Sequence, residues 1–228
     1  MTTNRLLERL PARDRAHVLA ECTLVELAIA EVLAEPGDPI PHVYFPTGGF
    51  ISLMVPMGDR GSIEVSVAGS EGMYGVPVAL GVEVSPAHAM VQGAGSAWQM
   101  GSVRFRRQLA HIPRFRAGVD RYIYVLMSQL IQTAGCNRFH VVEQRVARWL
   151  LVTGDRAHAS TFAITHEFLA YMLGVRRVGI TEAAGRLQEL GLIRYRRGIV
   201  TILDRKGLER ASCPCYLSDI ATYDRFIG

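Results

Sequence analysis

The chain has 228 residues, of which 49% are hydrophobic and 20% charged, and its formal net charge is +4 at pH 7. These ordinary proportions exclude a disordered or collagen-like chain, and the length suffices for two modest domains. No apolar run approaches the roughly 18 residues of a membrane span, and the charged N-terminus lacks the apolar stretch of a secretory signal, so we expect a cytoplasmic protein without a membrane partner.

The positive charge is concentrated in the C-terminal part of the chain. Residues 1–136 carry eleven basic and twelve acidic side chains, whereas residues 137–228 carry fourteen and nine, so the net charges are −1 and +5. Nearly all the basic residues are arginine, which can reflect genome composition. The position of each arginine must therefore decide whether it has a role.

The first half of the chain predicts two kinds of structure. Residues 5–22 predict one short helix, and a β pattern begins at Leu24. The segments YFPTGGFISLMVPM and GSIEVSVAG alternate apolar and polar positions, and AHAMVQGAG and SAWQM continue the pattern between glycines and prolines. Residues 24–101 therefore predict a small antiparallel barrel or double-sheet jelly roll.

Three helices are expected after this β region. Ser102 can cap a helix that ends before Pro113, a long helix follows over residues 114–134, and another covers residues 140–154. The long helix has an apolar seam at heptad spacing, which consists of Val119, Ile123, Leu126, Leu130 and Thr133. We expect the seam to hold two copies of the chain together, although packing on its own β domain would give the same pattern.

The C-terminal part predicts two short helices and a hairpin. Thr165 can cap the helix HEFLAYML, and Gly174 ends it. A second helix runs from about Arg176 to Gly191, and its buried side is predicted to contain Ile180, Ala183, Ala184, Leu187 and Leu190. The segment LIRYRRGIVTIL predicts two strands around Arg197-Gly198. This order is that of a winged helix-turn-helix, a DNA-binding arrangement.

The placement of the arginines fits DNA recognition better than an ordinary solvated surface. The expected base-reading residues at the start of the second helix are Arg176, Arg177, Val178, Thr181 and Glu182. The expected contacts to the DNA backbone are Thr165, His166, Arg194, Arg196 and Arg197.

The segment from Ile164 to Cys213, together with the order of the preceding elements, resembles the Crp/Fnr superfamily of bacterial transcription regulators over nearly the whole chain. The resemblance implies an α+β fold with an N-terminal antiparallel β-roll, a long dimerisation helix and a C-terminal winged helix-turn-helix. The three expected parts are a sensor-like domain (1–112), the dimerisation helix (113–137) and a DNA-binding domain (138–228). The resemblance also implies a homodimer that binds inverted repeats in double-stranded DNA, with RNA polymerase as a further partner.

The same resemblance implies that the DNA half-site and the effector pocket both differ from those of the cyclic-AMP-binding members. The family's base-reading positions fall on Arg177, Val178 and Glu182, and the last two differ from the residues of cyclic-AMP-binding members, so we expect a different half-site. The effector pocket is degenerate at the positions Gly75, Val76, Pro86, Ala87, Leu130 and Ile131. Of these only Gly75 keeps the family's residue, and the arginine and serine that hold the cyclic phosphate are replaced by Pro86 and Ala87. We therefore expect no useful affinity for cyclic AMP, and the effector is unknown.

The sequence predicts no cofactor and no metal. An iron–sulfur switch would need several cysteines near the N-terminus, where only Cys22 occurs, and haem would need an axial ligand such as His42 or His88. Cys213-Pro214-Cys215 lacks a second close pair, so a metal site there is disfavoured.

Two other functional classes would require different sequence features. An enzyme of the cupin type would need metal-binding histidine pairs on its strands, and neither these nor nucleophile or phosphate-loop motifs occur, so we expect no enzymatic activity. The stronger alternative is a dimeric interaction or small-molecule-sensing protein whose helix-turn-helix docks protein rather than DNA. Its partner binding would be insensitive to salt, whereas DNA binding weakens steeply with salt.

Overall fold

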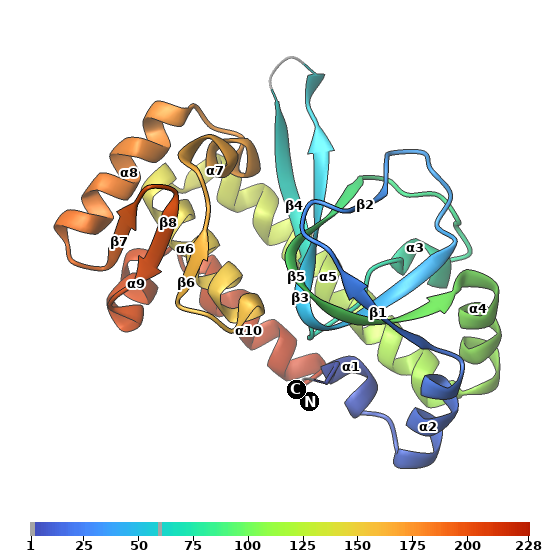
Figure 1. Ribbon diagram of the computed structural model, residues 1–228. Helices are drawn as coiled ribbons and strands as arrows, with labels where there is room; N and C mark the ends of the chain where they lie inside the picture. The colour runs from blue at the N-terminus through green and yellow to red at the C-terminus, as the bar shows by residue number, and fades with distance from the viewer. Residues whose placement is uncertain (1–2, 59–60) are drawn as a thin grey trace. The chain divides into compact units, whose positions relative to one another are not determined.

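The computed structural model describes residues 3–58 and 61–228, which divide into two compact units (Figure 1). The first unit contains the described residues up to Met54, Ser66–Met127 and Arg225–Gly228. The second contains Ser128–Asp224 and the described part of Val55–Val65. The boundary lies inside helix α5 (Pro113–Phe139), so the expected separate helical part is shared between the two units.

Two short helices stand where the sequence predicted one helix over residues 5–22. Helix α1 (Arg5–Glu8) begins after Asn4, whose side-chain oxygen accepts a hydrogen bond from the Leu7 amide at 3.2 Å. Helix α2 (Ala12–Ala20) begins after Pro11. The prediction of one helix was wrong because proline has no amide hydrogen and its ring clashes with the preceding turn.

An antiparallel sheet forms the main part of the first unit. Its strand order is β1-β5-β3-β4, and β2 also pairs with β5. The strands are β1 (Thr23–Leu27), β2 (Val32–Ala34), β3 (His42–Pro56), β4 (Ser62–Ala68) and β5 (His88–Gly101). A single turn of helix, α3 (Val76–Ala79), lies between β4 and β5 in the chain. The antiparallel β-rich domain predicted from the alternating pattern is confirmed.

Strand β5 is continuous although glycines interrupt its sequence. Its register with β3 shifts at three points between Pro46 and Ile51. A Cβ atom at Gly95 would lie 2.2 Å from the carbonyl carbon and oxygen of Gly48 on β3. The glycines therefore mark a close approach of two irregularly paired strands, not a turn between separate strands.

An aromatic core joins the sheet to the helices that follow it. Phe45 of β3, Phe105 of α4 (Ser102–His111) and Phe115 of α5 have ring centroids 5.7 to 6.2 Å apart, and each is at most 1% exposed. Ser102 is the first residue of α4 and not its cap, because its hydroxyl donates to the Ile40 carbonyl oxygen at 2.5 Å. This bond ties the start of α4 to the sheet domain.

The second unit is mainly helical, with a three-stranded sheet of order β6-β8-β7. Its elements after α5 are α6 (Val142–Ala157), β6 (Thr161–Ala163), α7 (His166–Leu173), α8 (Arg177–Glu189), β7 (Ile193–Arg196), β8 (Ile199–Ile202), α9 (Arg205–Ala211) and α10 (Cys215–Phe226). Helix α6 packs against α8 and α9, and the core between them includes Val146, Leu150, Ile180, Leu187 and Leu208. Among the described residues, no helix combines the length and the apolar character of a membrane span.

Helix α5 begins and ends close to the predicted limits but exposes a different apolar surface from the predicted seam. Val119 is fully buried within the single chain, so it is not available to a second chain. Ile123, Leu126 and Thr133 are half-buried, and Leu130 is 39% exposed. The most exposed apolar side chains of α5 are Phe139 at its end and the pair Ile131 and Met127, which lie one helical turn apart.

Candidate nucleic-acid interface

Two helices joined by a glycine turn form the centre of the candidate interface. Helix α7 begins after Thr165, whose hydroxyl accepts a hydrogen bond from the Phe168 amide at 3.1 Å. Gly174 ends α7 with a φ of +61°, a left-handed conformation that glycine adopts without steric cost. Helix α8 follows with Arg176 at its N-cap. The predicted order of capped helix, glycine turn and second helix is confirmed.

One face of α8 is buried and the opposite face is exposed. Ile180, Ala183, Ala184 and Leu187 are at most 3% exposed. Leu190, which was predicted to be buried with them, is 63% exposed because the helix ends at Glu189 and the chain turns away there. The five predicted base-reading residues are all exposed, namely Arg176, Arg177, Val178, Thr181 and Glu182.

A tight hairpin carries the second group of arginines. Strands β7 and β8 are joined by Arg197 and Gly198, which have φ values of +52° and +77°. Positive φ at both residues is the geometry that matches the twist of a two-residue hairpin. Arg194 and Arg196 lie on the same side of β7, because side chains alternate along a strand, and both are exposed, as is Arg197.

The arginines of these two elements have no acidic partner within the chain. Over the described residues, no ion pair or side-chain hydrogen bond involves the guanidinium groups of Arg176, Arg177, Arg194, Arg196 and Arg197. By contrast, Arg186 near the end of α8 pairs with Glu143 at 2.7 Å. Exposed guanidinium groups without a partner are free to bind phosphates and the edges of guanine bases.

His166 connects the two helices and the hairpin. Its Nδ1 lies 3.0 Å from the Thr181 hydroxyl, and its ring stacks on Tyr195 with centroids 4.2 Å apart. Since Thr181 donates its only hydroxyl hydrogen to the Arg177 carbonyl oxygen at 3.1 Å, the Nδ1 of His166 must carry a hydrogen and donate it to Thr181. The Nδ1 of His166 and the hydroxyl of Thr181 are thus already engaged within the protein.

The remaining nitrogen of His166 disfavours a charged ring. Nε2 is buried and has no hydrogen-bond partner in the described structure. A second proton would have to sit on this nitrogen. Burial first, and the positive charge of Arg177 second, lower the pKa of His166 below its usual range. The histidine is therefore a neutral structural link at this interface.

The positions of the predicted effector pocket carry no charged side chain. Gly75 has a φ of +94°, and a Cβ there would lie 2.8 Å from Cγ1 of Val43. Val76 and Ala87 are buried, whereas Pro86 is exposed. On α5, Leu130 and Ile131 are both exposed, the latter at 72%. The turn of the pocket is present, but these positions offer no counter-charge for a phosphate.

The structure also brings together four residues that sequence reasoning did not connect. Cys136, His140, Cys213 and Cys215 have metal-binding atoms that all lie within 4.8 Å of one another. Cys136 and Cys213 are 77 positions apart, so no local motif contains both. The available signals were the pair Cys213 and Cys215 and the spacing of Cys136 and His140, which places both on one side of a helical turn.

Comparison with known proteins agrees with the geometry of the second unit. Residues 144–211 match the family of the Crp-like helix-turn-helix domain. This match covers most of α6 and continues to the end of α9, so it includes both helices of the interface and the arginine hairpin. No curated protein sequence matches the chain.

Solved structures share the fold at low sequence identity. FixK2 from Bradyrhizobium japonicum superposes with a TM-score of 0.71 and 13% identity, over 84% of this chain and 98% of that chain. The c-di-GMP-responsive global regulator CLP from Xanthomonas campestris gives 0.69 and 18%, over 84% and 99%. A CRP-family transcriptional regulator from Thermus thermophilus gives 0.68 and 18%, over 82% and 96%. The chain therefore contains a Crp-like helix-turn-helix domain at residues 144–211 and has the fold of the Crp/Fnr family of transcription regulators over most of its length.

Proposed function

We propose that the protein is a homodimeric, sequence-specific DNA-binding regulator that reads an inverted repeat. The observation that carries this proposal is the group of five exposed arginines without protein partners at the start of α8 and on the β7–β8 hairpin. Their position within a Crp-like helix-turn-helix domain supports this proposal, because such domains bind a duplex through the second helix. RNA polymerase is the proposed further partner of a regulator of this kind.

The residues of the interface divide into two roles. Arg177, Val178 and Glu182 are proposed to read base edges. Arginine can donate two hydrogen bonds to guanine, valine can contact the thymine methyl group, and glutamate can accept a hydrogen bond from the cytosine amino group. Arg176 and Thr181 border this set, and the hydroxyl of Thr181 is shared with His166. Arg194, Arg196 and Arg197 are proposed to bind phosphates, with Thr165 and His166 beside them.

Helix α5 is the proposed site of dimerisation. Tyr124, Met127 and Ile131 are 52%, 55% and 72% exposed and occur at helical spacing, next to Leu130. Large apolar side chains grouped on one helix face are typical of a protein interface. Two copies related by a twofold axis would place their α8 helices about 34 Å apart, one turn of DNA, on the two halves of a palindromic site.

The first unit is proposed not to respond to cyclic AMP. A buried phosphate is costly without a positive partner, and Val76, Pro86 and Ala87 supply none. The related CLP responds to c-di-GMP, so a change of effector within this fold has a precedent. For this chain the effector is proposed to be a different molecule or to be absent.

Selection of DNA from a random pool by the purified, ligand-free protein tests the proposal. We expect enrichment of an inverted repeat, and the affinity for this site should fall steeply as salt is raised, because binding releases counterions. The protein-docking alternative predicts no enrichment and partner binding that is insensitive to salt. A matched pool competition with Arg177→Ala, which removes one proposed base contact per protomer, shows whether the enriched sequence depends on α8.

A further inference from the structure

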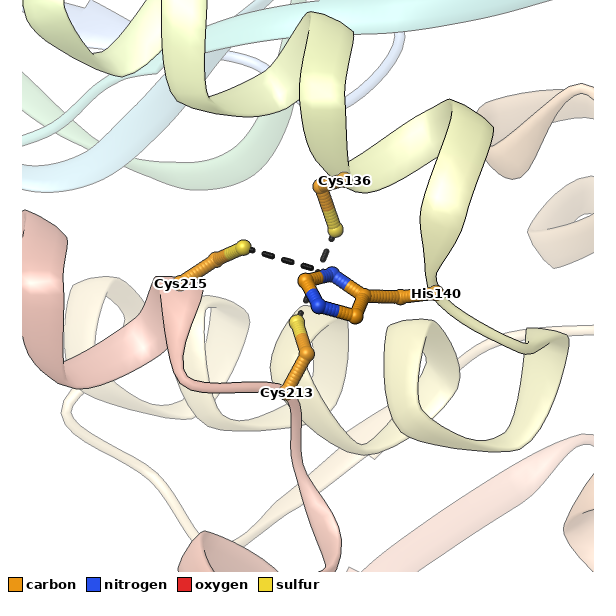
Figure 2. A group of neighbouring side chains, drawn as sticks. All are labelled: Cys136, His140, Cys213 and Cys215. Atoms are coloured by element: carbon orange, nitrogen blue, oxygen red, sulfur yellow. Dashed lines mark hydrogen bonds between the residues drawn. The ribbon is translucent and has the colours of Figure 1, made fainter.

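Four side chains from distant parts of the second unit point toward one another (Figure 2). Cys136 lies in the last turn of α5, and His140 lies in the turn that leads to α6. Cys213 and Cys215 flank Pro214 at the link between α9 and α10. The three cysteines are at most 2% exposed, and they form a buried cluster of their own.

The distances within this group match a single tetrahedral ion. The Sγ atoms of Cys136 and Cys213 are 3.5 Å apart, and the Sγ of Cys215 is 3.5 Å from Nδ1 of His140. Zinc holds sulfur at about 2.3 Å and imidazole nitrogen at about 2.0 Å, so the edges of its tetrahedron measure about 3.5 to 3.8 Å. The remaining pairs are within 4.8 Å and need to close by about 1.3 Å at most.

Hydrogen-bonding and positively charged side chains surround the group. The Gln132 side-chain amide donates a hydrogen bond to the Sγ of Cys215 at 2.9 Å. Arg145 and Arg148 both interact electrostatically with Cys136 and Cys213. Arg148 is in turn oriented by Asp219 at 2.6 Å. Metal-binding residues commonly have such a surrounding shell, which orients them and offsets the negative charge of three thiolates around a divalent ion.

We propose that Cys136, His140, Cys213 and Cys215 bind one Zn²⁺ ion in a closed, structural site. Three thiolates and one imidazole at tetrahedral spacing are a known ligand set for zinc. All four positions are filled by protein, so no position stays open for a substrate. Each thiol that is protonated before binding releases its proton to the solvent.

The position of the site indicates its role in the fold. The ligands lie in two groups, residues 136–140 and 213–215, which are separated by the whole Crp-like helix-turn-helix domain at residues 144–211. An ion bound by both groups closes this long loop at its base. It thereby fixes the end of α5 to the start of α10, and it stabilises the fold because the assembled site does not exist in the unfolded chain.

Metal analysis of the reduced, full-length protein tests the site. We expect about one zinc per chain to remain after gel filtration, because all four ligands come from the protein. Cys213→Ser and His140→Gln should each lose this zinc. Cys22→Ser is the matched control, since Cys22 lies in the first unit and its thiol donates to the Val18 carbonyl oxygen at 3.3 Å. It should keep a full complement of zinc.

A second measurement keeps the test valid if a variant fails to fold. Wild-type protein is stripped with a chelator, reduced and titrated with Co²⁺, which should give thiolate-to-metal charge-transfer bands and the ligand-field spectrum of a tetrahedral ion, with an endpoint at one equivalent. The proposal is overturned if wild type takes up neither zinc nor cobalt, or if Cys213→Ser retains as much zinc as wild type. A Cys136–Cys213 disulfide in the freshly isolated protein would also overturn it. The measurement uses no DNA, so its failure is distinguishable from failure of the DNA proposal.

Discussion

Replacing Arg196 by alanine should weaken the salt dependence of DNA binding. The size of this effect follows from the number of phosphate contacts that we propose. The guanidinium group of Arg196 is exposed on β7 and has no partner among the described residues. Its removal therefore leaves no acidic group unpaired, and the free energy of unfolding should change little. The expected effect is confined to DNA.

The size of the effect follows from the number of phosphates neutralised. Arg194, Arg196 and Arg197 supply three proposed phosphate contacts per protomer, or six per dimer. The logarithm of the binding constant then falls with the logarithm of salt concentration at a slope of about −5.4, since each contact contributes about −0.9. Arg196→Ala leaves four contacts and a slope of about −3.6. Between 50 and 200 mM salt, the wild type should lose about 2,000-fold in affinity and the variant about 150-fold.

Fluorescence anisotropy with a labelled duplex of the selected sequence, repeated over a series of KCl concentrations, measures both slopes. Arg104→Ala serves as the charge-matched control, because Arg104 lies on α4 of the first unit and its side chain is 63% exposed. The reasoning is refuted if Arg196→Ala keeps the wild-type slope, or if Arg104→Ala lowers the slope by the same amount.

Four further predictions concern the interface and the sensor. Arg177→Ala should cost roughly 1–3 kcal/mol on the selected site and relax its base preference in a repeated selection, whereas a uniform loss across sequences would contradict base reading. Thr165→Ala removes the N-cap hydrogen bond of α7 and should lower the free energy of unfolding in urea by about 1 kcal/mol, while Thr165→Ser should retain most of it. The pKa of His166 is lower in the folded protein than its ordinary value of 6.5, so the unfolded chain takes up the proton first. The contribution of the neutral His166 to the free energy of unfolding is therefore present above pH 6.5 and is lost as the pH falls below it. The urea midpoints of His166→Gln should lack this part of the pH dependence. Calorimetry should detect no binding of cyclic AMP, and a micromolar affinity would contradict the account of Val76, Pro86 and Ala87.

The parts of the fold that depend on local chemistry could be predicted from the sequence. Thr165, Gly174 and the pair Arg197-Gly198 each act within a few residues, through a cap, a left-handed turn and a tight hairpin, and the structure has all three where the sequence placed them. The alternation of apolar residues predicted the sheet for the same reason. Local hydrogen bonding and side-chain periodicity are visible in a single sequence.

The features that depend on distant contacts could not be predicted. Val119 fits a heptad seam, but in the structure it is fully buried within the single chain. The glycines near the middle of β5 resemble a turn until the approach of Gly48 on the neighbouring strand is known. From the sequence, the hydroxyl of Thr181 was expected to be free to bind a base. In the structure it is hydrogen-bonded to His166, which lies fifteen positions earlier. The thiols of Cys136 and Cys213 are brought into contact only by tertiary packing.

The turn at Arg197 implies a conflict between stability and recognition. A residue with a Cβ is strained at a φ of +52°, and asparagine or glycine would occupy this position more easily. Arg197→Asn should therefore make the hairpin more stable while it removes a positive charge from the tip. A screen for thermostable variants would favour this change, and a screen for operator binding would reject it. Disagreement between the two screens at this position would identify the hairpin tip as a place where function, not folding, determines the residue.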